Sequence, residues 1–351
     1  MKRLFFVFVS SLSSVMAATP ATDYVAQGDT LKAQGDFKAA IADYTEAIAA
    51  DPQNIRAYLG RASVLTLEGD HLAAIADETK AIALDPKNAV AYGNRGNART
   101  AQGDLSGAIA DYTQAIALDP HHVHAFINRG NVKNLQKKYR AAIDDYSAAI
   151  ALDPKNAAAY YDRAGAKRSL GDYAGAQADY SQAISLNPVD APAYINRAVL
   201  EIAQRNWSGA TSDLNKAGSL LPPERQAYVQ VYHWVIAAHQ GKAQQATNDL
   251  AKLADTGAKS LSSTWGWEIA KFLAGQLDEK QFLASAVSFQ AKKDKGQKAQ
   301  ANYFVGLKRE VAGDKAGAAK SFHQSVNLGN PSLHEYVLAR EELKTSGGAK
   351  P

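Results

Sequence analysis

Cysteine is absent from the 351-residue sequence. Its absence excludes disulfide bonds, thiol catalysis, cysteine-based metal sites and a lipid attached to an N-terminal cysteine. If a protein of this composition is exported, it must be held together by packing alone.

An excess of one charge is also lacking. The 39 Lys and Arg residues nearly balance the 35 Asp and Glu residues, so the formal net charge is +4. Lys2 and Arg3 supply two of these charges, and a chain without them carries +2 (4 − 2). Bulk electrostatics therefore gives no reason to expect a nucleic-acid partner. The 46% hydrophobic content excludes wholesale disorder.

Long hydrophobic runs are missing except near the start. Residues 4–15 form an apolar run, preceded by the two basic residues and followed by Ala17 and Ala18. A membrane-spanning helix needs about 20 apolar residues, and no later segment is apolar enough to span. The layout predicts a signal peptide over 1–18 that is cleaved, and hence a periplasmic or secreted protein without a transmembrane segment. The alternative is an uncleaved anchor.

The sequence is rich in one feature, an internal repeat of 34 residues. An aromatic residue recurs at Tyr24, Tyr58, Tyr92, Phe126, Tyr160, Tyr194 and Tyr228. A proline recurs at Pro52, Pro86, Pro120, Pro154, Pro188 and Pro222. Each period reads as two helices, the first ended by a turn such as Gly103–Asp104 and the second by the proline.

These units resemble tetratricopeptide repeats, whose 34-residue pattern they share. The resemblance implies an all-α fold, a right-handed superhelical solenoid of helix-turn-helix repeats with a concave groove and a helical C-terminal cap. Six repeats are expected over 21–54, 55–88, 89–122, 123–156, 157–190 and 191–224. Beyond them we expect a degenerate seventh repeat over 225–258, an irregular helical segment over 259–298, an eighth repeat over 299–332, a capping helix over 333–345 and a disordered tail over 346–351.

The C-terminal part carries a second resemblance. The order of WGW at 265–267, Tyr-Phe-x-Gly at 303–306, Gly-Asp at 313–314 and a closing Glu-Tyr at 335–336 resembles the bacterial periplasmic adaptor family called new lipoprotein I. The WGW stretch also resembles C-terminal modules of many other bacterial tetratricopeptide proteins. The first resemblance implies a scaffold for envelope proteases or cell-wall hydrolases, and a homodimer.

A row of polar residues follows the first helices. When each repeat is numbered from 1, position 6 shares the face that lines the groove in this family. An amide donates and accepts, so it can pair with a peptide backbone. The alternative is a solvated helix face, copied with the repeat and without a role. The candidate partner-binding residues are Asn94, Asn97, Asn128, Asn131, Asn134, Tyr161, Asp162, Arg168 and Asn196.

A second row carries charge, with Arg at position 7 and Asp at position 23. An anion-binding stripe is one reading, but a carboxylate at the same period favours paired charges within the stack, since a guanidinium suits a carboxylate. If each Asp pairs with the Arg of the next repeat, Asp213 has no partner in the row. If each Asp pairs with the Arg of its own repeat, Asp43 has none. The row consists of Arg61, Arg95, Arg129, Arg163 and Arg197 with Asp43, Asp77, Asp111, Asp145, Asp179 and Asp213.

The sequence gives only weak indications of a metal site or of a site for a C-terminal carboxylate. His121, His122 and His124 lie on one turn, but no carboxylate stands beside them in an obvious ligand spacing, so we expect no metal and no cofactor. The Lys and Asn set with which chaperone-binding relatives capture a C-terminal carboxylate does not occur. Glu78 replaces the aromatic of position 24 in the second repeat, for which the sequence offers no account.

The sequence therefore predicts a non-catalytic exported scaffold or adaptor for protein or peptide partners. The alternative is a chaperone or assembly factor for an envelope or secretion complex.

Overall fold

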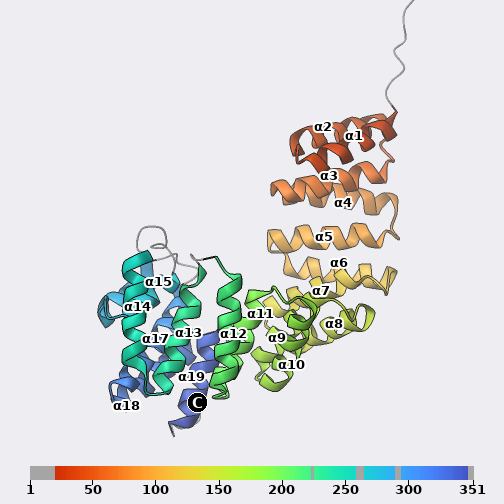
Figure 1. Cartoon of the computed structure of the whole chain (residues 1–351). Helices are drawn as coiled ribbons and strands as arrows, with labels where there is room; N and C mark the ends of the chain where they lie inside the picture. The colour runs from red at the N-terminus through yellow and green to blue at the C-terminus, as the bar shows by residue number, and fades with distance from the viewer. Residues whose placement is uncertain (1–19, 223–224, 258–264, 289–293, 347–351) are drawn as a thin grey trace, which may run out of the picture. The chain divides into compact units, whose positions relative to one another are not determined.

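The structure is a computed structural model that describes residues 20–222, 225–257, 265–288 and 294–346. These residues form nineteen α-helices and no strand (Figure 1), which confirms the all-α prediction. The predicted signal peptide over 1–18 lies outside the described residues, as does most of the predicted tail. None of the described helices has the length and hydropathy to span a bilayer. The chain divides into two compact units between Val132 and Lys133.

The first unit is a stack of helix pairs. Each expected repeat holds one pair, and each of the first five helices packs against the next one along the chain. The helices are α1 (Ala21–Gln34), α2 (Phe37–Ala50), α3 (Ile55–Glu68), α4 (His71–Leu84), α5 (Ala89–Gln102), α6 (Leu105–Leu118) and α7 (Val123–Leu135), the last of which crosses into the second unit.

The helix ends follow from the turn residues. Asp104 caps α6, because its side chain accepts a hydrogen bond from the backbone N–H of Gly107. Such a cap stabilises a helix by about 1 kcal/mol. Gly103 ends α5 with a φ of 89°, a left-handed conformation that glycine adopts without strain. The same pairing of a glycine with an aspartate recurs at 35–36 and 69–70.

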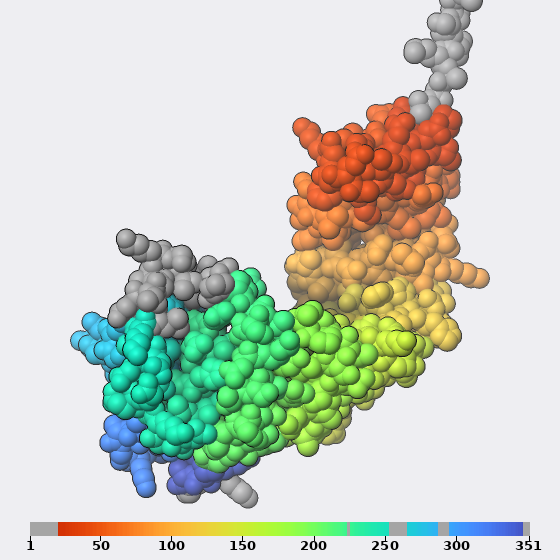
Figure 2. All heavy atoms as spheres, viewed as in Figure 1, coloured from red at the N-terminus to blue at the C-terminus, as the bar shows by residue number. Residues whose placement is uncertain are grey.

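Close packing explains the small residues of the first helices. The ring of Tyr112, at position 24, lies so close to Gly96 that a Cβ there would stand 2.7 Å from it. Tyr112 and its counterpart Tyr44 are fully buried. Figure 2 shows side chains filling the spaces between successive helices within each unit.

The second unit continues the pairs and ends in a single helix. Its helices are α8 (Tyr139–Leu152), α9 (Ala157–Leu170), α10 (Tyr173–Leu186), α11 (Ala191–Ala203), α12 (Trp207–Leu220), α13 (Ala227–His239), α14 (Ala243–Gly257), α15 (Trp265–Leu273), α16 (Glu279–Ser288), α17 (Asp294–Val311), α18 (Lys315–Leu328) and α19 (His334–Thr345). The segment expected to be irregular thus contains the pair α15–α16, and α15 packs against α13 and α14.

The WGW segment belongs to the core. Trp265 and Trp267 are buried, and Phe272 and Phe282 stack with their ring centroids 4.3 Å apart. The WGW segment therefore packs inside the second unit.

The last helix does more than cover the final repeat. α19 packs against α17 and α18 and also against α11. Its Val337 is buried in a cluster with Ala164 of α9, Tyr180 of α10 and Leu200 of α11. The C-terminal helix therefore covers the first helices of two earlier repeats.

Candidate functional site

The arginines of position 7 pair within their own repeats. The Nε and Nη2 atoms of Arg61 donate to the two carboxylate oxygens of Asp77 at 2.7 and 2.8 Å. The same two-bond geometry holds Arg95 to Asp111, Arg163 to Asp179 and Arg197 to Asp213. The first repeat has Gln27 at position 7, which leaves Asp43 without such an arginine.

Each arginine also reaches the preceding repeat. Its Nη1 donates to a hydroxyl at position 25, a contact that the sequence analysis missed although the hydroxyl recurs with the same period. The acceptors at 3.0–3.1 Å are Thr45, Thr79, Thr113, Ser147 and Ser181, for Arg61, Arg95, Arg129, Arg163 and Arg197 respectively. The arginine therefore joins the two helices of one repeat and ties that repeat to the one before it.

Position 11 supplies a second cation to three of the aspartates. Arg99 contacts Asp111, Lys133 contacts Asp145 and Lys167 contacts Asp179, each at 2.7 Å. Because their hydrogen-bonding groups are engaged inside the stack, we expect these charges to act as a structural frame and not as an anion-binding stripe.

The amide row has one open pair, in the first unit. Asn97 Oδ1 accepts hydrogen bonds from the hydroxyl of Tyr112 at 2.7 Å and from Asn128 Nδ2 at 2.8 Å. Asn97 is exposed and Asn128 is half-buried. Within the described part of the chain, no side-chain hydrogen bond involves Asn97 Nδ2 or Asn128 Oδ1. A free donor and a free acceptor therefore stand on adjacent amides.

Asn94 has a different role from Asn97. It hydrogen-bonds the side chain of Glu78, which is only 2% exposed. Burial raises the pKa of Glu78 to about 8, although the hydrogen bond from Asn94 lowers it. Glu78 Oε2 nevertheless has no hydrogen-bond partner among the described residues, so the contact does not account for the unusual Glu78, and a partner-binding role for Asn94 stays a prediction.

Other members of the row are less open. The Oδ1 atom of Asn134 is buried without a hydrogen-bond partner, and Asn131 is half-buried. Asp162 is half-buried, and burial raises its pKa to about 6.

In the second unit the chain itself occupies the predicted partner-binding residues. Asn196 is 7% exposed, and its Oδ1 accepts from Arg168 at 2.7 Å and lies 2.7 Å from Nε2 of His334, at the start of α19. Asn196 Nδ2 donates to the hydroxyl of Tyr161 at 2.9 Å, and Arg168 Nη2 donates to the carbonyl of Ser332. The prediction that these three residues face a partner is corrected, because the C-terminal segment covers them.

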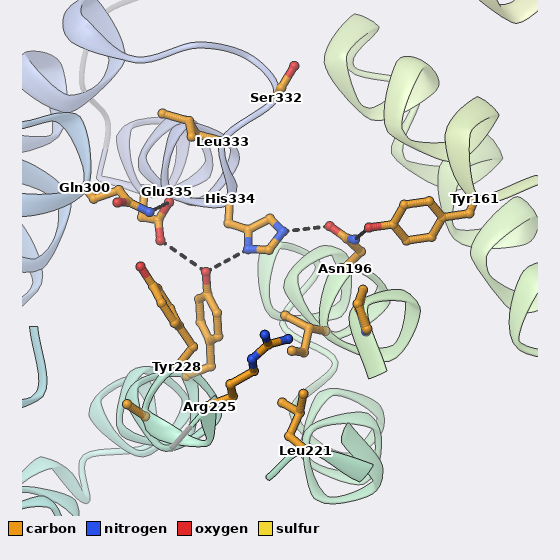
Figure 3. A pocket seen from close by; sticks show the side chains of 14 residues that line it. Tyr161, Asn196, Leu221, Arg225, Tyr228, Gln300, Ser332, Leu333, His334 and Glu335 are labelled. Atoms are coloured by element: carbon orange, nitrogen blue, oxygen red, sulfur yellow. Dashed lines mark hydrogen bonds between the residues drawn. The ribbon is translucent and has the colours of Figure 1, made fainter. Parts of the chain in front are cut away.

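The same network runs further into the second unit. The hydroxyl of Tyr232 lies 2.9 Å from His334 Nδ1 and 3.1 Å from Glu335 Oε1 (Figure 3). Because Asn196 Oδ1 is an acceptor, His334 must donate from Nε2. Burial lowers the pKa of His334 and raises the pKa of Glu335. Both shifts favour the uncharged forms of these two buried side chains.

Beside this network lies a cavity of about 580 Å³ (Figure 3). It is bounded by residues from α9, α11, the end of α12, the start of α13, α17 and α19. The lining residues are Tyr161, Pro192, Ile195, Asn196, Leu221, Arg225, Ala227, Tyr228, Tyr232, Gln300, Ser332, Leu333, His334 and Glu335. Across the described ranges, no group of His, Asp and Glu side chains has a metal-binding arrangement.

Models of the tetratricopeptide repeat match residues 25–89, 89–122, 123–156 and 161–218. Together they cover more than half of the sequence, and the chain belongs to the tetratricopeptide repeat family. Repeats of this kind form scaffolds that bind protein or peptide partners, typically without catalysis. The matches end before residue 263, so the resemblance of the C-terminal part to new lipoprotein I rests on its motifs alone.

Two solved structures with TM-scores above 0.5 agree on the fold. A tetratricopeptide repeat protein from Parabacteroides merdae is 21% identical over 73% of this chain and 97% of its own, with a TM-score of 0.52. PilF of Pseudomonas aeruginosa is 21% identical over 57% of this chain and 92% of its own, also with a TM-score of 0.52. MamA is 27% identical over 48% of this chain and 92% of its own, with a TM-score of 0.44. No curated protein matches the sequence.

Proposed function

We propose that the protein is an exported scaffold that holds an extended segment of a partner protein against Asn97 and Asn128. The observation that carries this proposal is the free donor on Asn97 beside the free acceptor on Asn128. One residue of an extended chain presents its own N–H and C=O on the same side, and the two amides match that pair. Such contacts bind a main chain and leave its side chains largely unread.

The setting of the pair supports the same function. Asn97 Oδ1 is held by two donors, so its Nδ2 points in a fixed direction before any partner arrives. A pre-positioned polar group loses little entropy on binding. The two residues lie at positions 9 and 6 of consecutive repeats, as expected for a ligand that runs along the stack.

The proposed cellular context is the bacterial periplasm, and it rests on features of the sequence. The basic and apolar start of the sequence supports export to the periplasm, and the motifs over 263–343 support an adaptor for envelope proteases or cell-wall hydrolases, with a homodimer as its assembly state. A chaperone or assembly factor would use the same amides for contacts of shorter lifetime. Dissociation rates of a purified partner distinguish the two roles.

The test begins with decapeptides selected on the full-length protein from a random display library. We expect the selected peptides to bind the double variant Asn97→Ala/Asn128→Ala at least tenfold more weakly, since two hydrogen bonds are lost. The matched control is Gln114→Ala, an exposed amide on α6, which should leave the affinity unchanged. Equal binding to all three proteins would show that the amide pair is not the peptide site.

A further inference from the structure

The cavity of the second unit is suited to an apolar ligand. Its walls include the side chains of Pro192, Ile195, Leu221, Ala227 and Leu333. A volume of about 580 Å³ lies within the range of roughly 300–1,000 Å³ that is typical of small-molecule pockets. Burial of an apolar group against such walls is the main source of binding energy.

Most polar groups around the cavity are already paired. Asn196 uses its oxygen and its nitrogen within the chain, as described above. Gln300 accepts from the indole N–H of Trp265 at 2.7 Å and donates to Glu335 at 3.0 Å. The hydroxyl of Ser332 lies 3.1 Å from the hydroxyl of Ser169. These groups therefore offer little to a ligand.

Two lining groups have no hydrogen bond at all among the described residues, and both can donate. Within the described residues, neither the guanidinium of Arg225 nor the hydroxyl of Tyr228 has a hydrogen bond or an ion pair, and Figure 3 shows the Arg225 side chain extending into the cavity. Burial raises the pKa of Tyr228, with the charge of Glu335 adding to the effect, so its hydroxyl keeps the proton. The start of α13 at Ala227 adds the positive end of a helix dipole.

Arg225 can only donate and the Tyr228 hydroxyl can donate as well, so these groups favour a ligand that accepts hydrogen bonds. We propose that the cavity binds an apolar carboxylate, whose hydrocarbon part lies against the apolar walls and whose carboxylate accepts hydrogen bonds from Arg225 and Tyr228. A single arginine balances one negative charge, which favours a carboxylate over a phosphate dianion. The proposal concerns the second unit and does not depend on the amide pair of the first.

A fatty acid and the C-terminal residue of a peptide share this chemistry. The experiment is calorimetric titration of the full-length protein with four probes: decanoate, 1-decanol, N-acetyl-Leu-Leu and N-acetyl-Leu-Leu-amide. We expect one of the two acids to bind, and to bind at least tenfold more tightly than its uncharged analogue. Binding of decanoate alone identifies a lipid-like ligand, and binding of N-acetyl-Leu-Leu alone identifies a peptide C-terminus.

Variants locate the site of binding. Arg225→Gln should weaken binding of the acid about tenfold, and Tyr228→Phe should weaken it severalfold. Neither change should unfold the protein, because the polar groups removed have no hydrogen bond among the described residues and a Phe ring keeps the packing of Tyr228 against Gly266. The matched control is Arg140→Gln, an exposed arginine on α8, which should have no effect. Ile195→Trp should block binding by filling the cavity. The proposal is overturned if neither acid binds, if acid and uncharged analogue bind equally, or if Arg225→Gln and Arg140→Gln behave alike.

Discussion

Both carboxylate oxygens of Asp111 accept hydrogen bonds from Arg95, at 2.8 and 3.0 Å, within one repeat. The side chains are only 13% and 4% exposed. Arg95→Ala leaves that carboxylate with Arg99 alone, so we expect the free energy of unfolding to fall by about 3 kcal/mol. Urea unfolding measures this loss.

The matched control is Arg56→Ala, whose partner Asp29 lies 2.6 Å away but whose side chain is 76% exposed. An exposed pair contributes about 0–1 kcal/mol. If the two variants lose the same stability, the arginines of position 7 are not a structural frame.

Glu78 should make the stability of the protein depend on pH. Its pKa is about 8 in the folded protein against an ordinary 4.5, so the folded state holds the proton more tightly. The stability from this group is complete below pH 4.5 and is lost as the pH rises through about 8. Glu78→Gln keeps a neutral group beside Asn94. Relative to wild type, we expect the free energy of unfolding of this variant to rise by about 4 kcal/mol between pH 5 and pH 9, as measured by urea unfolding at both pH values. A constant difference would contradict the burial argument.

Lys137 adopts a left-handed backbone conformation with a φ of 60°, where most repeats have glycine. A side chain in this region costs about 1 kcal/mol. Lys137→Gly should therefore raise the free energy of unfolding by about that amount, even though glycine usually destabilises. The control is Lys80→Gly, on the exposed face in the middle of α4, which should lower the free energy of unfolding by about 1 kcal/mol. A loss of stability in both variants would contradict the prediction.

Glu335 offers a test of the network that anchors α19. Its carboxyl is 1% exposed, contacts Tyr232 and Gln300, and has a raised pKa. If it is protonated, Glu335→Gln preserves its hydrogen bonds and changes the melting temperature little. Glu335→Ala removes them and should cost about 2–3 kcal/mol. Equal losses in the two variants would show that the network needs a charged carboxylate.

The fold could be predicted from the sequence because a period of 34 residues fixes both helices of every repeat. The pairing of Arg95 with Asp111 could not be predicted fully from the sequence. The period places an Arg and an Asp on the facing helices of every repeat, but it does not show whether they pair within a repeat or between adjacent repeats. The hydroxyls of position 25 carried the same period and were detectable. Their side chains are small and common on helix surfaces, so their recurrence alone does not indicate a contact with arginine.

The binding residues were harder to predict. Asn94 and Asn128 occupy the same position of consecutive repeats, yet one bonds a buried glutamate and the other an exposed amide. The difference lies at position 24 of the preceding repeat, Glu78 in one case and Tyr112 in the other. Asn196 meets His334, 138 residues away, through a helix that lies outside the regular repeats. No local pattern encodes such a contact.

The most direct test of the peptide site is a double-mutant cycle between Asn128 and one peptide bond of a selected ligand. In the ligand, each N–H in turn is replaced by N-methyl, and each peptide is titrated against wild type and Asn128→Ala. We predict that one N-methyl group weakens binding to wild type about tenfold and has little further effect on Asn128→Ala, because both changes remove the same hydrogen bond. If every N-methyl group costs the same affinity in both proteins, Asn128 does not bind the main chain and the proposed function is wrong.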